Sequence, residues 1–337
     1  MPVVHSIYRY PIKGLSPQSL TGVVLEEGRP FPFDRVFALT RPGSAPVTSA
    51  ARWAKKGLFL MLMLEDALAC VRTHLDVETM QLTVRRAGAG DAAAPMLDVN
   101  LRETEGCRAV EAFFSRQVPG LASAPTLVQS RDGHFMDKPE NVISCINLAT
   151  VRSLEQRLGY PVHPLRFRAN FYLEGVPPWE EFDWIGGDLA LGGVTFQVDR
   201  RNGRCGAVNV NPETGARDLD LPAALRAAYG HKDLGVYLIA RNGGQVAVGD
   251  RVVVPQGAAS PRRAAAFVPP APEQVAFICR GCYYIYEESK GAPGLGAGTV
   301  FADIPGDWRC PDCGTEKGNF RRYVTPAPST AIRTNPA

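Results

Sequence analysis

The last third of the chain contains two short cysteine motifs, Cys279-Arg-Gly-Cys282 and Cys310-Pro-Asp-Cys313-Gly314. Each Cys-x-x-Cys loop can hold two thiolates on the same side of one metal ion, so the two loops together can supply four sulfur ligands in a tetrahedron. The spacing alone leaves zinc and a single iron open, because both ions accept four thiolates. This stretch therefore predicts a small domain organised around a metal site, with Cys279, Cys282, Cys310 and Cys313 as the ligands.

The residues around the two motifs favour iron over zinc. Aromatic side chains can enclose a small metal site, and this region is rich in them: Tyr284, Tyr286, Phe301, Trp308 and Phe320. Together with Pro305-Gly306-Asp307-Trp308, which leads into the second motif, they resemble rubredoxin over roughly residues 275–323. The resemblance implies one iron in a four-cysteine site and a domain that carries one electron at a time without performing substrate chemistry. A structural zinc ribbon is the alternative.

Length and composition indicate a folded, soluble protein of several domains. The 337 residues exceed what one ordinary core holds, and 45% hydrophobic with 21% charged residues are typical of globular proteins. A net charge of +3 is too weak to indicate nucleic acid or a membrane surface as a partner. No apolar run reaches transmembrane length, and the N-terminus lacks the pattern of a secretion signal. Eight cysteines without an export signal favour reduced thiols and metal ligands, and hence a cytoplasmic location.

Short β-branched or alternating segments dominate the first 255 residues, and only three stretches have helical periodicity. Helices are expected over residues 105–118 and 147–158 and from Pro222 to Gly230. Strands are expected at Val3–Lys13, Val36–Thr40, Ala67–His74, Met80–Arg86, Thr126–Ser130, Phe167–Leu173, Asp188–Asp199, Val208–Val210, and in a hairpin from Gly235 to Val254. This pattern indicates a mainly β protein of the α+β class, in which a few helices close the ends of β-barrels.

Two segments are rich in alanine and proline and have no apolar period. Residues 256–274 are expected to form an inter-domain linker, and the tail 325–337 is expected to be disordered. They delimit the metal domain, residues 275–324.

Among the remaining cysteines, Cys205 has the most unusual surroundings. It stands in Asp199-Arg-Arg-Asn-Gly-Arg-Cys205-Gly206, where three arginines create a positive potential that favours the thiolate. The alternative is a buried cysteine that acts as a small hydrophobic residue, but the polar and glycine neighbours argue against it. Cys70, Cys107 and Cys145 lie in apolar, patterned segments and are assigned to packing.

An ordered series of motifs runs through the first 255 residues. It comprises Tyr10-Pro-Ile-Lys13, Phe33-Asp-Arg35, Phe167-Arg-Ala-Asn170, Ile185-Gly-Gly-Asp188, Arg204-Cys205 before Val-Asn-Pro-Glu-Thr-Gly, and Tyr237 before Val248-Gly-Asp250. The series resembles the MOSC proteins that carry an additional N-terminal β-barrel domain, which include the mitochondrial amidoxime reducing components and their bacterial counterparts. The resemblance implies an N-terminal β-barrel domain at 1–125 and a MOSC-type β-barrel at 126–255. It also implies a molybdenum cofactor (molybdopterin) with Cys205 as protein ligand to molybdenum.

The residue types at the matched positions suit a pterin cofactor that carries a phosphate. Arg35 and Arg168 can bind the phosphate through charge-assisted hydrogen bonds, and Lys13 can add a point charge. Asn170 offers a donor and an acceptor for the pterin edge, and Tyr237 is a further candidate contact. The alternatives are solvated surface charges for the basic residues and a strand aromatic for Tyr237.

Together, the two resemblances imply a molybdenum-dependent reductase of N-hydroxylated or S-oxide small molecules. Its own rubredoxin domain would supply electrons one at a time, drawing them from an external NAD(P)H-dependent reductase. Bound water or Asp199 could supply protons. One alternative is a cofactor or sulfur carrier with a persulfide on Cys205, whose electron module serves a partner. Another is a binding barrel with a structural zinc ribbon.

Overall fold

The computed structural model describes residues 1–48, 51–90, 92–255, 276–279, 284–312 and 314–323. The expected linker at 256–274, the expected tail at 325–337, and the predicted ligands Cys282 and Cys313 lie outside these ranges.

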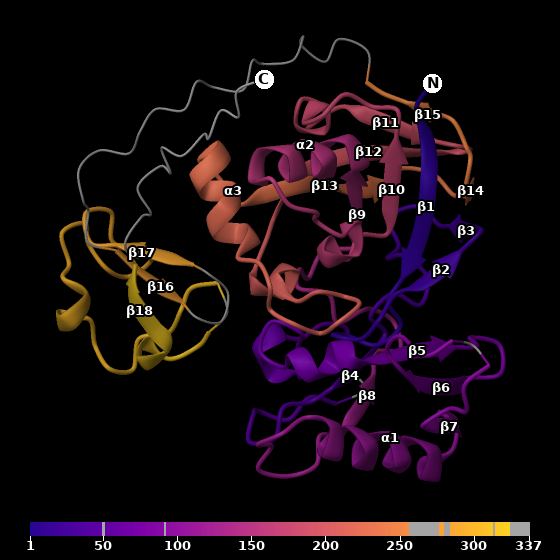
Figure 1. The fold of residues 1–337 in the computed structure, drawn as a ribbon, viewed down its shortest axis with the longest axis horizontal. Coiled ribbons are helices and arrows are strands. Elements are labelled where there is room, and N and C mark those ends of the chain that lie inside the picture. The colour runs from indigo at the N-terminus through magenta and orange to yellow at the C-terminus, as the bar shows by residue number, and fades with distance from the viewer. Residues whose placement is uncertain (49–50, 91, 256–275, 280–283, 313, 324–337) are drawn as a thin grey trace, which may run out of the picture.

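The described chain is mainly β with a few helices, which confirms the predicted fold class (Figure 1). The three α-helices begin and end close to the expected positions, and Gly159 and Gly230 stop two of them with φ of 75° and 76°. Their bounds are α1 Thr104–Gln117, α2 Leu148–Leu158 and α3 Leu221–Tyr229.

A curled eight-stranded sheet forms the centre of the larger body, in the order β15-β11-β12-β13-β9-β10-β1-β2. Its pairs are antiparallel except β9–β10, which is parallel because α2 provides the crossover between these two strands. The strands are β1 Val3–Arg9, β2 Gln18–Leu20, β9 Ile143–Asn147, β10 Phe171–Glu174, β11 Asp188–Leu191, β12 Val194–Gly203, β13 Asp233–Ala240 and β15 Val252–Val253.

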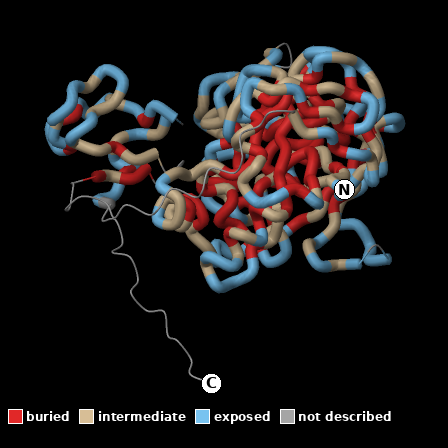
Figure 2. Tube along the Cα trace, turned by 90° about the horizontal axis from the view of Figure 1, so that it is seen from above, coloured by how far each residue is buried: buried red, intermediate tan, exposed pale blue. Residues whose placement is uncertain are grey.

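The concave side of this sheet encloses one hydrophobic core. A second pair of strands, β3 Gly22–Leu25 and β14 Gly244–Ala247, contributes Val23, Leu25 and Val246 to the same core. On another side, α2 and α3 pack with residues such as Val151, Leu154 and Leu225 in a separate cluster. Figure 2 shows the buried residues concentrated inside the larger body.

A second part, drawn below the large sheet in Figure 1, is built from two small sheets and α1. Its core joins Val110 and Phe114 of α1 to the sheets. Strands β1 and β2, which the sequence analysis placed with this N-terminal part, instead lie in the large sheet, so the two parts are interleaved. The strands here are β4 Phe37–Leu39, β5 Val71–Leu75, β6 Gln81–Arg86, β7 Leu97–Asn100 and β8 Leu127–Gln129.

The small C-terminal domain contains a three-stranded sheet in the order β17-β16-β18 and lies beside α3 in Figure 1. The expected aromatic cluster is present: Phe301 and Trp308 both lie against Phe320, with ring centres 5.5 and 5.3 Å away. Its strands are β16 Ala276–Cys279, β17 Ile285–Glu287 and β18 Phe320–Tyr323.

Two strand predictions are wrong because apolar residues that face a core were interpreted as strands. Val208–Val210 is not a strand: Gly206–Asn209 form a 3-10 helix, in which the Val208 N–H donates to the Cys205 carbonyl at 3.2 Å. Ala67 to Cys70 are likewise within a 3-10 helix, and the strand begins at Val71. In both segments the apolar side chains pack into a core without forming a strand ladder, and Val210 makes only an isolated β-bridge with Arg217.

Three further strand predictions miss a turn or a pairing. The expected hairpin from Gly235 to Val254 does not form, because both edges of β13 are occupied by β12 and β9, so β14 pairs with β3. The segment Asp188–Asp199 is a hairpin of β11 and β12, which are joined at Gly192-Gly193. The strand expected from Phe167 begins only at Phe171, since Pro164–Phe167 form a 3-10 helix.

Within the described ranges, each helix is too short or too polar to cross a membrane.

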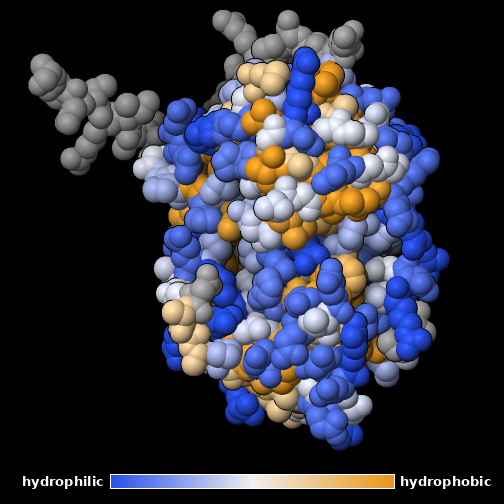
Figure 3. All heavy atoms as spheres, turned by 90° about the vertical axis from the view of Figure 1, so that its right-hand side faces the viewer, coloured by the Kyte–Doolittle hydropathy of each residue, from blue (hydrophilic) through white to orange (hydrophobic). Residues whose placement is uncertain are grey.

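Exposed hydrophobic residues include Val24, Val248 and Val253, which belong to or border β3, β14 and β15. Figure 3 views the side of the molecule on which these strands lie, and it shows hydrophobic and hydrophilic residues interspersed.

One buried carboxyl group beneath α2 gives the fold a pH-dependent stability. Glu181 is 1% exposed, and its Oε2 accepts hydrogen bonds from Asn147 Nδ2 at 3.0 Å and Thr150 Oγ1 at 2.9 Å. Burial raises the pKa of Glu181 to about 7. The folded state therefore retains a proton that the unfolded state has lost, and this contribution to stability declines as the pH rises through 7.

Glu181→Gln should raise the melting temperature at pH 8 and have little effect at pH 5, because the amide mimics the protonated acid. The gain at pH 8 is expected to be on the order of 1–3 kcal/mol, at about 1.4 kcal/mol per pKa unit. Thermal melts at both pH values test this, with the exposed Glu78→Gln as matched control. An equal change at pH 5 and pH 8 would contradict the assignment.

Candidate active site

A cavity of about 430 Å³ opens where the large sheet, the N-terminal part and the C-terminal domain meet. Five of the six residues predicted to contact a cofactor line it: Lys13, Arg35, Arg168, Cys205 and Tyr237. They come from five separate stretches of the chain, which the fold brings together around one cavity.

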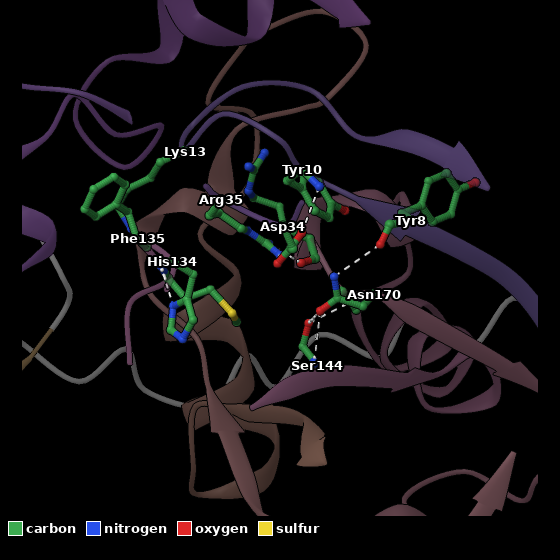
Figure 4. A network of polar contacts seen from close by, with 12 residues as sticks. Tyr8, Tyr10, Lys13, Asp34, Arg35, His134, Phe135, Ser144 and Asn170 are labelled. Carbon is green, nitrogen blue, oxygen red and sulfur yellow. Dashed lines mark hydrogen bonds and ion pairs between the residues drawn. The ribbon is translucent and has the colours of Figure 1, made fainter. Parts of the chain in front are cut away.

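Arg35 and Arg168 contact the same tyrosine ring. Their guanidinium carbons lie 4.1 and 4.4 Å from the centre of the Tyr10 ring, and Arg35 Nη2 donates to the Arg168 carbonyl at 2.8 Å (Figure 4 shows Tyr10 and Arg35). Both arginines have φ of 52°, in the left-handed region that side chains other than glycine rarely adopt. Such strain persists where surrounding contacts fix the backbone, and it is concentrated at functional sites.

The two arginines differ in how their charge is balanced. Burial disfavours the Arg35 cation, but Asp34, Tyr10 and Asp137 together outweigh it and raise the pKa of Arg35, with the adjacent Asp34 carboxylate contributing most among them. For Arg168, burial together with the nearby Arg35 charge lowers the pKa to about 10. Arg168 donates from Nη1 to the Leu15 carbonyl at 2.8 Å. An anion in the cavity would relieve the repulsion between the two guanidinium groups, so Arg168 is the residue best placed to bind one.

Lys13 is held in the wall by an acidic partner that the sequence analysis did not identify. Its Nζ donates to Asp137 Oδ1 at 2.5 Å and to the Phe135 carbonyl at 2.8 Å. Lys56 lies 3.8 Å from the other oxygen of the same carboxylate. Burial opposes the Asp137 charge, but Lys13 and Lys56 outweigh it and hold the pKa of Asp137 well below its usual range.

Asn170 does not line the cavity. Its Oδ1 accepts from the backbone N–H and the hydroxyl of Ser144, both at 3.1 Å, and its Nδ2 donates to the Tyr8 carbonyl at 3.2 Å (Figure 4). These contacts link β9 to β1 beside Ser144, which does line the cavity. The proposed contact of Asn170 with a cofactor stays a prediction.

Cys205 follows the end of β12, where the register with β13 shifts twice, between Val198 and Arg200 and between Arg201 and Gly203. Such bulges re-aim the chain next to active sites. The three arginines of this segment are directed to other partners: Arg204 to the carbonyls of Phe167 and Leu234, Arg200 to Asp199 and Glu140, and Arg201 to the Phe182 ring.

Tyr237 contributes a protonated hydroxyl to the cavity wall. It lies on β13 opposite Arg200, and burial raises the pKa of Tyr237 to about 12 despite the nearby Arg204 cation. With its amide oriented by the network, Asn202 donates to Tyr237 Oη at 3.0 Å and accepts from Arg204 at 3.3 Å. Asp199, one of the two proton sources considered beside bound water, is paired with Arg200 and is not among the residues that line the cavity.

The cavity as a whole is strongly basic. Ten of its lining residues are lysine or arginine and two are aspartate. Several of these cations are paired, as Arg166 is with Asp218 at 2.6 Å, but the balance remains positive. A cavity of this charge and size is suited to an anionic small-molecule ligand.

The C-terminal domain forms one wall of the same cavity. Pro311 and Asp312, from the second cysteine motif, line it together with Cys205. Lys232 of the large body lies 3.3 Å from Asp312. The predicted ligands Cys279 and Cys310 are buried in one apolar cluster, and Cys205 borders that cluster.

The residues that join the two modules and those that balance the charges of the cavity carry no recognisable signal in the sequence. Met61 and Met63 belong to the apolar cluster of the C-terminal domain, and Lys232 pairs with that domain. The apolar run at 58–64 was visible in the sequence, but nothing in it indicated a partner. Asp137 and Lys56 stand in no recognisable motif, so only the folded structure reveals them.

Comparisons with known proteins also separate the larger body from the C-terminal domain. A family model for the MOSC domain matches residues 132–253, and one for rubredoxin matches residues 276–320. Rubredoxin 3 of Rhodococcus erythropolis is 50% identical over 58 residues, which are 16% of this chain and 88% of that protein. Rubredoxin of Megasphaera elsdenii is 54% identical over 45 residues, 13% of this chain and 86% of that protein.

Among solved structures, the crystal structure of YiiM from Geobacillus stearothermophilus aligns with a TM-score of 0.27 and 23% sequence identity. The alignment covers 33% of this chain and only 53% of the YiiM chain. This TM-score is too low to define a shared fold.

The fold and the site define a protein of two modules, a β-rich body with a basic cavity and a small electron-transfer domain. Residues 276–320 are a rubredoxin domain, through which the chain belongs to the rubredoxin family, and residues 132–253 are a MOSC domain. The rubredoxin domain supports one iron in a four-cysteine site, as the sequence analysis predicted.

Proposed function

We propose that this protein is a molybdenum-cofactor-dependent reductase of N-hydroxylated or S-oxide small molecules that receives electrons from its own rubredoxin domain. The observation that carries the proposal is the shared wall: Pro311 and Asp312 of the second cysteine motif line the cavity that contains Cys205. A sulfur or cofactor carrier does not require a one-electron module at its reactive cysteine, whereas a reductase does.

The residues present fit a molybdopterin group. The cavity offers a cysteine as a soft metal ligand and a surplus of cations for a phosphate. Arg168 and Arg35 would hold the phosphate, with Tyr10 fixing the spacing of their guanidinium groups. Cys205 would ligate the metal, and Tyr237 would donate its hydroxyl to the cofactor or the substrate. When bound, the cofactor supplies oxygen-atom abstraction and two-electron redox chemistry.

The residues of this protein supply the other functions that the reaction needs. Reduction of an amidoxime breaks the N–O bond, consumes two electrons and two protons, and releases an amidine and water. The positive wall attracts an anionic cofactor, and the docked small domain limits the access of bulk water. Since the iron of a rubredoxin carries a single electron, two deliveries are needed for each substrate molecule. We expect an external NAD(P)H-dependent reductase to refill it in the cytoplasm, where the cysteine ligands stay reduced before metal binding.

Metal analysis and an assay on protein made in a molybdenum-competent host test this function together. We expect one molybdenum and one iron per chain, and reduction of benzamidoxime when an artificial donor reduces the iron. Iron without molybdenum, no turnover, and a persulfide on Cys205 would favour the sulfur carrier. Zinc alone would favour a structural role for the small domain.

Arg168→Ala should weaken cofactor retention, because it removes charge-assisted hydrogen bonds to the anionic group. Such bonds are worth about 1.5–3 kcal/mol, which corresponds to roughly 10- to 100-fold in affinity. Molybdopterin content after gel filtration measures the loss, with the exposed Arg157→Ala on α2 as matched control. Undiminished content in Arg168→Ala would remove this residue from the site.

A further inference from the structure

The rubredoxin domain forms part of the cavity wall and so closes one side of the cavity. Pro311 and Asp312 contribute to the same wall as Lys232 and Cys205. A ligand that enters the cavity from this side must therefore pass the small domain or displace it.

The receiving surface on the larger body is apolar and is held in a fixed shape. Met61 and Met63 are 7% and 4% exposed and belong to the cluster that contains Cys279 and Cys310. Arg217 Nη2 donates to the carbonyls of Leu62 at 3.1 Å and Met63 at 2.9 Å. At the other end of this loop, the Met61 N–H donates to the Glu65 carboxylate at 3.0 Å. The loop thus presents two flexible thioether side chains on a rigid backbone, which suits a surface that binds and releases a partner.

The polar contact across this junction is weak. Asp312 is 44% exposed and Lys232 23% exposed in their side chains, so solvent and salt screen the pair. Among the described residues, this screened ion pair and the contact of Met61 and Met63 with the apolar cluster join the two parts, which suits a tethered domain that is held reversibly rather than permanently. The tether keeps the released domain at high effective concentration, so it returns readily.

We propose that the rubredoxin domain is a removable cap on the Cys205 cavity, docked on the surface formed by Met61, Met63 and Lys232. In the docked state it shields Cys205 and, if the proposed reductase function holds, delivers its electron there. In the released state it admits the substrate and exposes its iron side to the external reductase. Docking and substrate entry therefore alternate.

The accessibility of the Cys205 thiol tests the cap without the molybdenum cofactor. Cofactor-free, iron-loaded protein is treated with iodoacetamide, and alkylation of Cys205 is followed by peptide mass spectrometry, with exposed Cys70 as the internal reference. In Lys232→Glu, the Cys205 rate should rise about fivefold relative to Cys70, the size of effect expected for losing one such ion pair. The charge swap Lys232→Glu with Asp312→Lys should restore the slow rate.

A matched control is Lys290→Glu, which makes the same charge change on the small domain at a residue that pairs with Glu287 and does not line the cavity. It should leave the rate unchanged. Wild-type protein should show faster Cys205 alkylation when sodium chloride is raised from about 0.05 M to about 0.5 M, because salt weakens the pair. The ferric absorbance verifies that each variant keeps its iron.

Unchanged alkylation in both Lys232→Glu and high salt would overturn the cap. Faster alkylation that the charge swap fails to restore would also overturn it, because local charge rather than docking would then be the cause. Neither result depends on molybdenum, so failure of the cap and failure of the reductase proposal are distinguishable.

Discussion

Cys205→Ala should abolish molybdenum-dependent reduction while leaving the fold and the rubredoxin iron intact. Cys205 borders the cavity at the end of β12, where its side chain is partly exposed, so its loss creates no large void in a core. Even outer-shell partners of metal ligands cost about 10- to 100-fold when removed, so loss of a ligand should cost at least about 100-fold in kcat/KM. Steady-state turnover of benzamidoxime measures this, with metal content recorded for the same samples.

The matched control is Cys70→Ala, which removes an exposed thiol that does not line the cavity. It should retain wild-type turnover and metal content. Full activity in Cys205→Ala, with molybdenum still bound, would show that this cysteine is not the metal ligand.

Cys310→Ser should remove the visible absorbance of the iron site and stop the supply of electrons to the cavity. Cys310 is 2% exposed, and its N–H donates to the Thr315 carbonyl at 2.8 Å within the second cysteine loop. Because a metal site and the small domain around it are coupled in folding, losing one ligand should destabilise this domain as well. Turnover driven through the iron should fall at least about 100-fold, while molybdenum content stays near that of the wild type.

Absorption spectra, metal analysis and thermal melts of Cys310→Ser check these outcomes. The transition of the larger body should remain, because its cores are formed by the MOSC and N-terminal residues. Cys107→Ser serves as a control for cysteine replacement. A colourless wild-type protein with stoichiometric zinc would contradict the electron-transfer role directly.

The sequence predicted best those features that depend on short-range chemistry. Two cysteine motifs with interleaved aromatics specify a rubredoxin domain, since the metal geometry fixes the spacing. Helix ends at Gly159 and Gly230 were readable because glycine adopts the left-handed conformation that stops a helix. The role of Arg35 and Arg168 in ligand binding stays a prediction; the structure places both side chains against the ring of Tyr10.

Features that depend on side-chain orientation and on long-range pairing in the folded chain could not be predicted from the sequence. Asn170 stays a predicted cofactor contact, but no local pattern indicated that its amide would be hydrogen-bonded to Ser144 and Tyr8. Val208–Val210 looked like a strand because valine favours both strands and cores. The acidic partner of Lys13 lies 124 residues away, and no local pattern marks such a pairing.

Electron transfer from the rubredoxin iron to the Cys205 cavity is tested most directly by asking whether substrate reoxidises the reduced iron within the same chain. Protein reduced anaerobically and freed of excess reductant is mixed with benzamidoxime in a stopped-flow instrument, and the ferric absorbance is followed. We expect the absorbance to return in the wild type at a rate independent of protein concentration, and not to return in Cys205→Ala. Iron that stays reduced in the molybdenum-loaded wild type would contradict transfer from the rubredoxin domain to the Cys205 cavity.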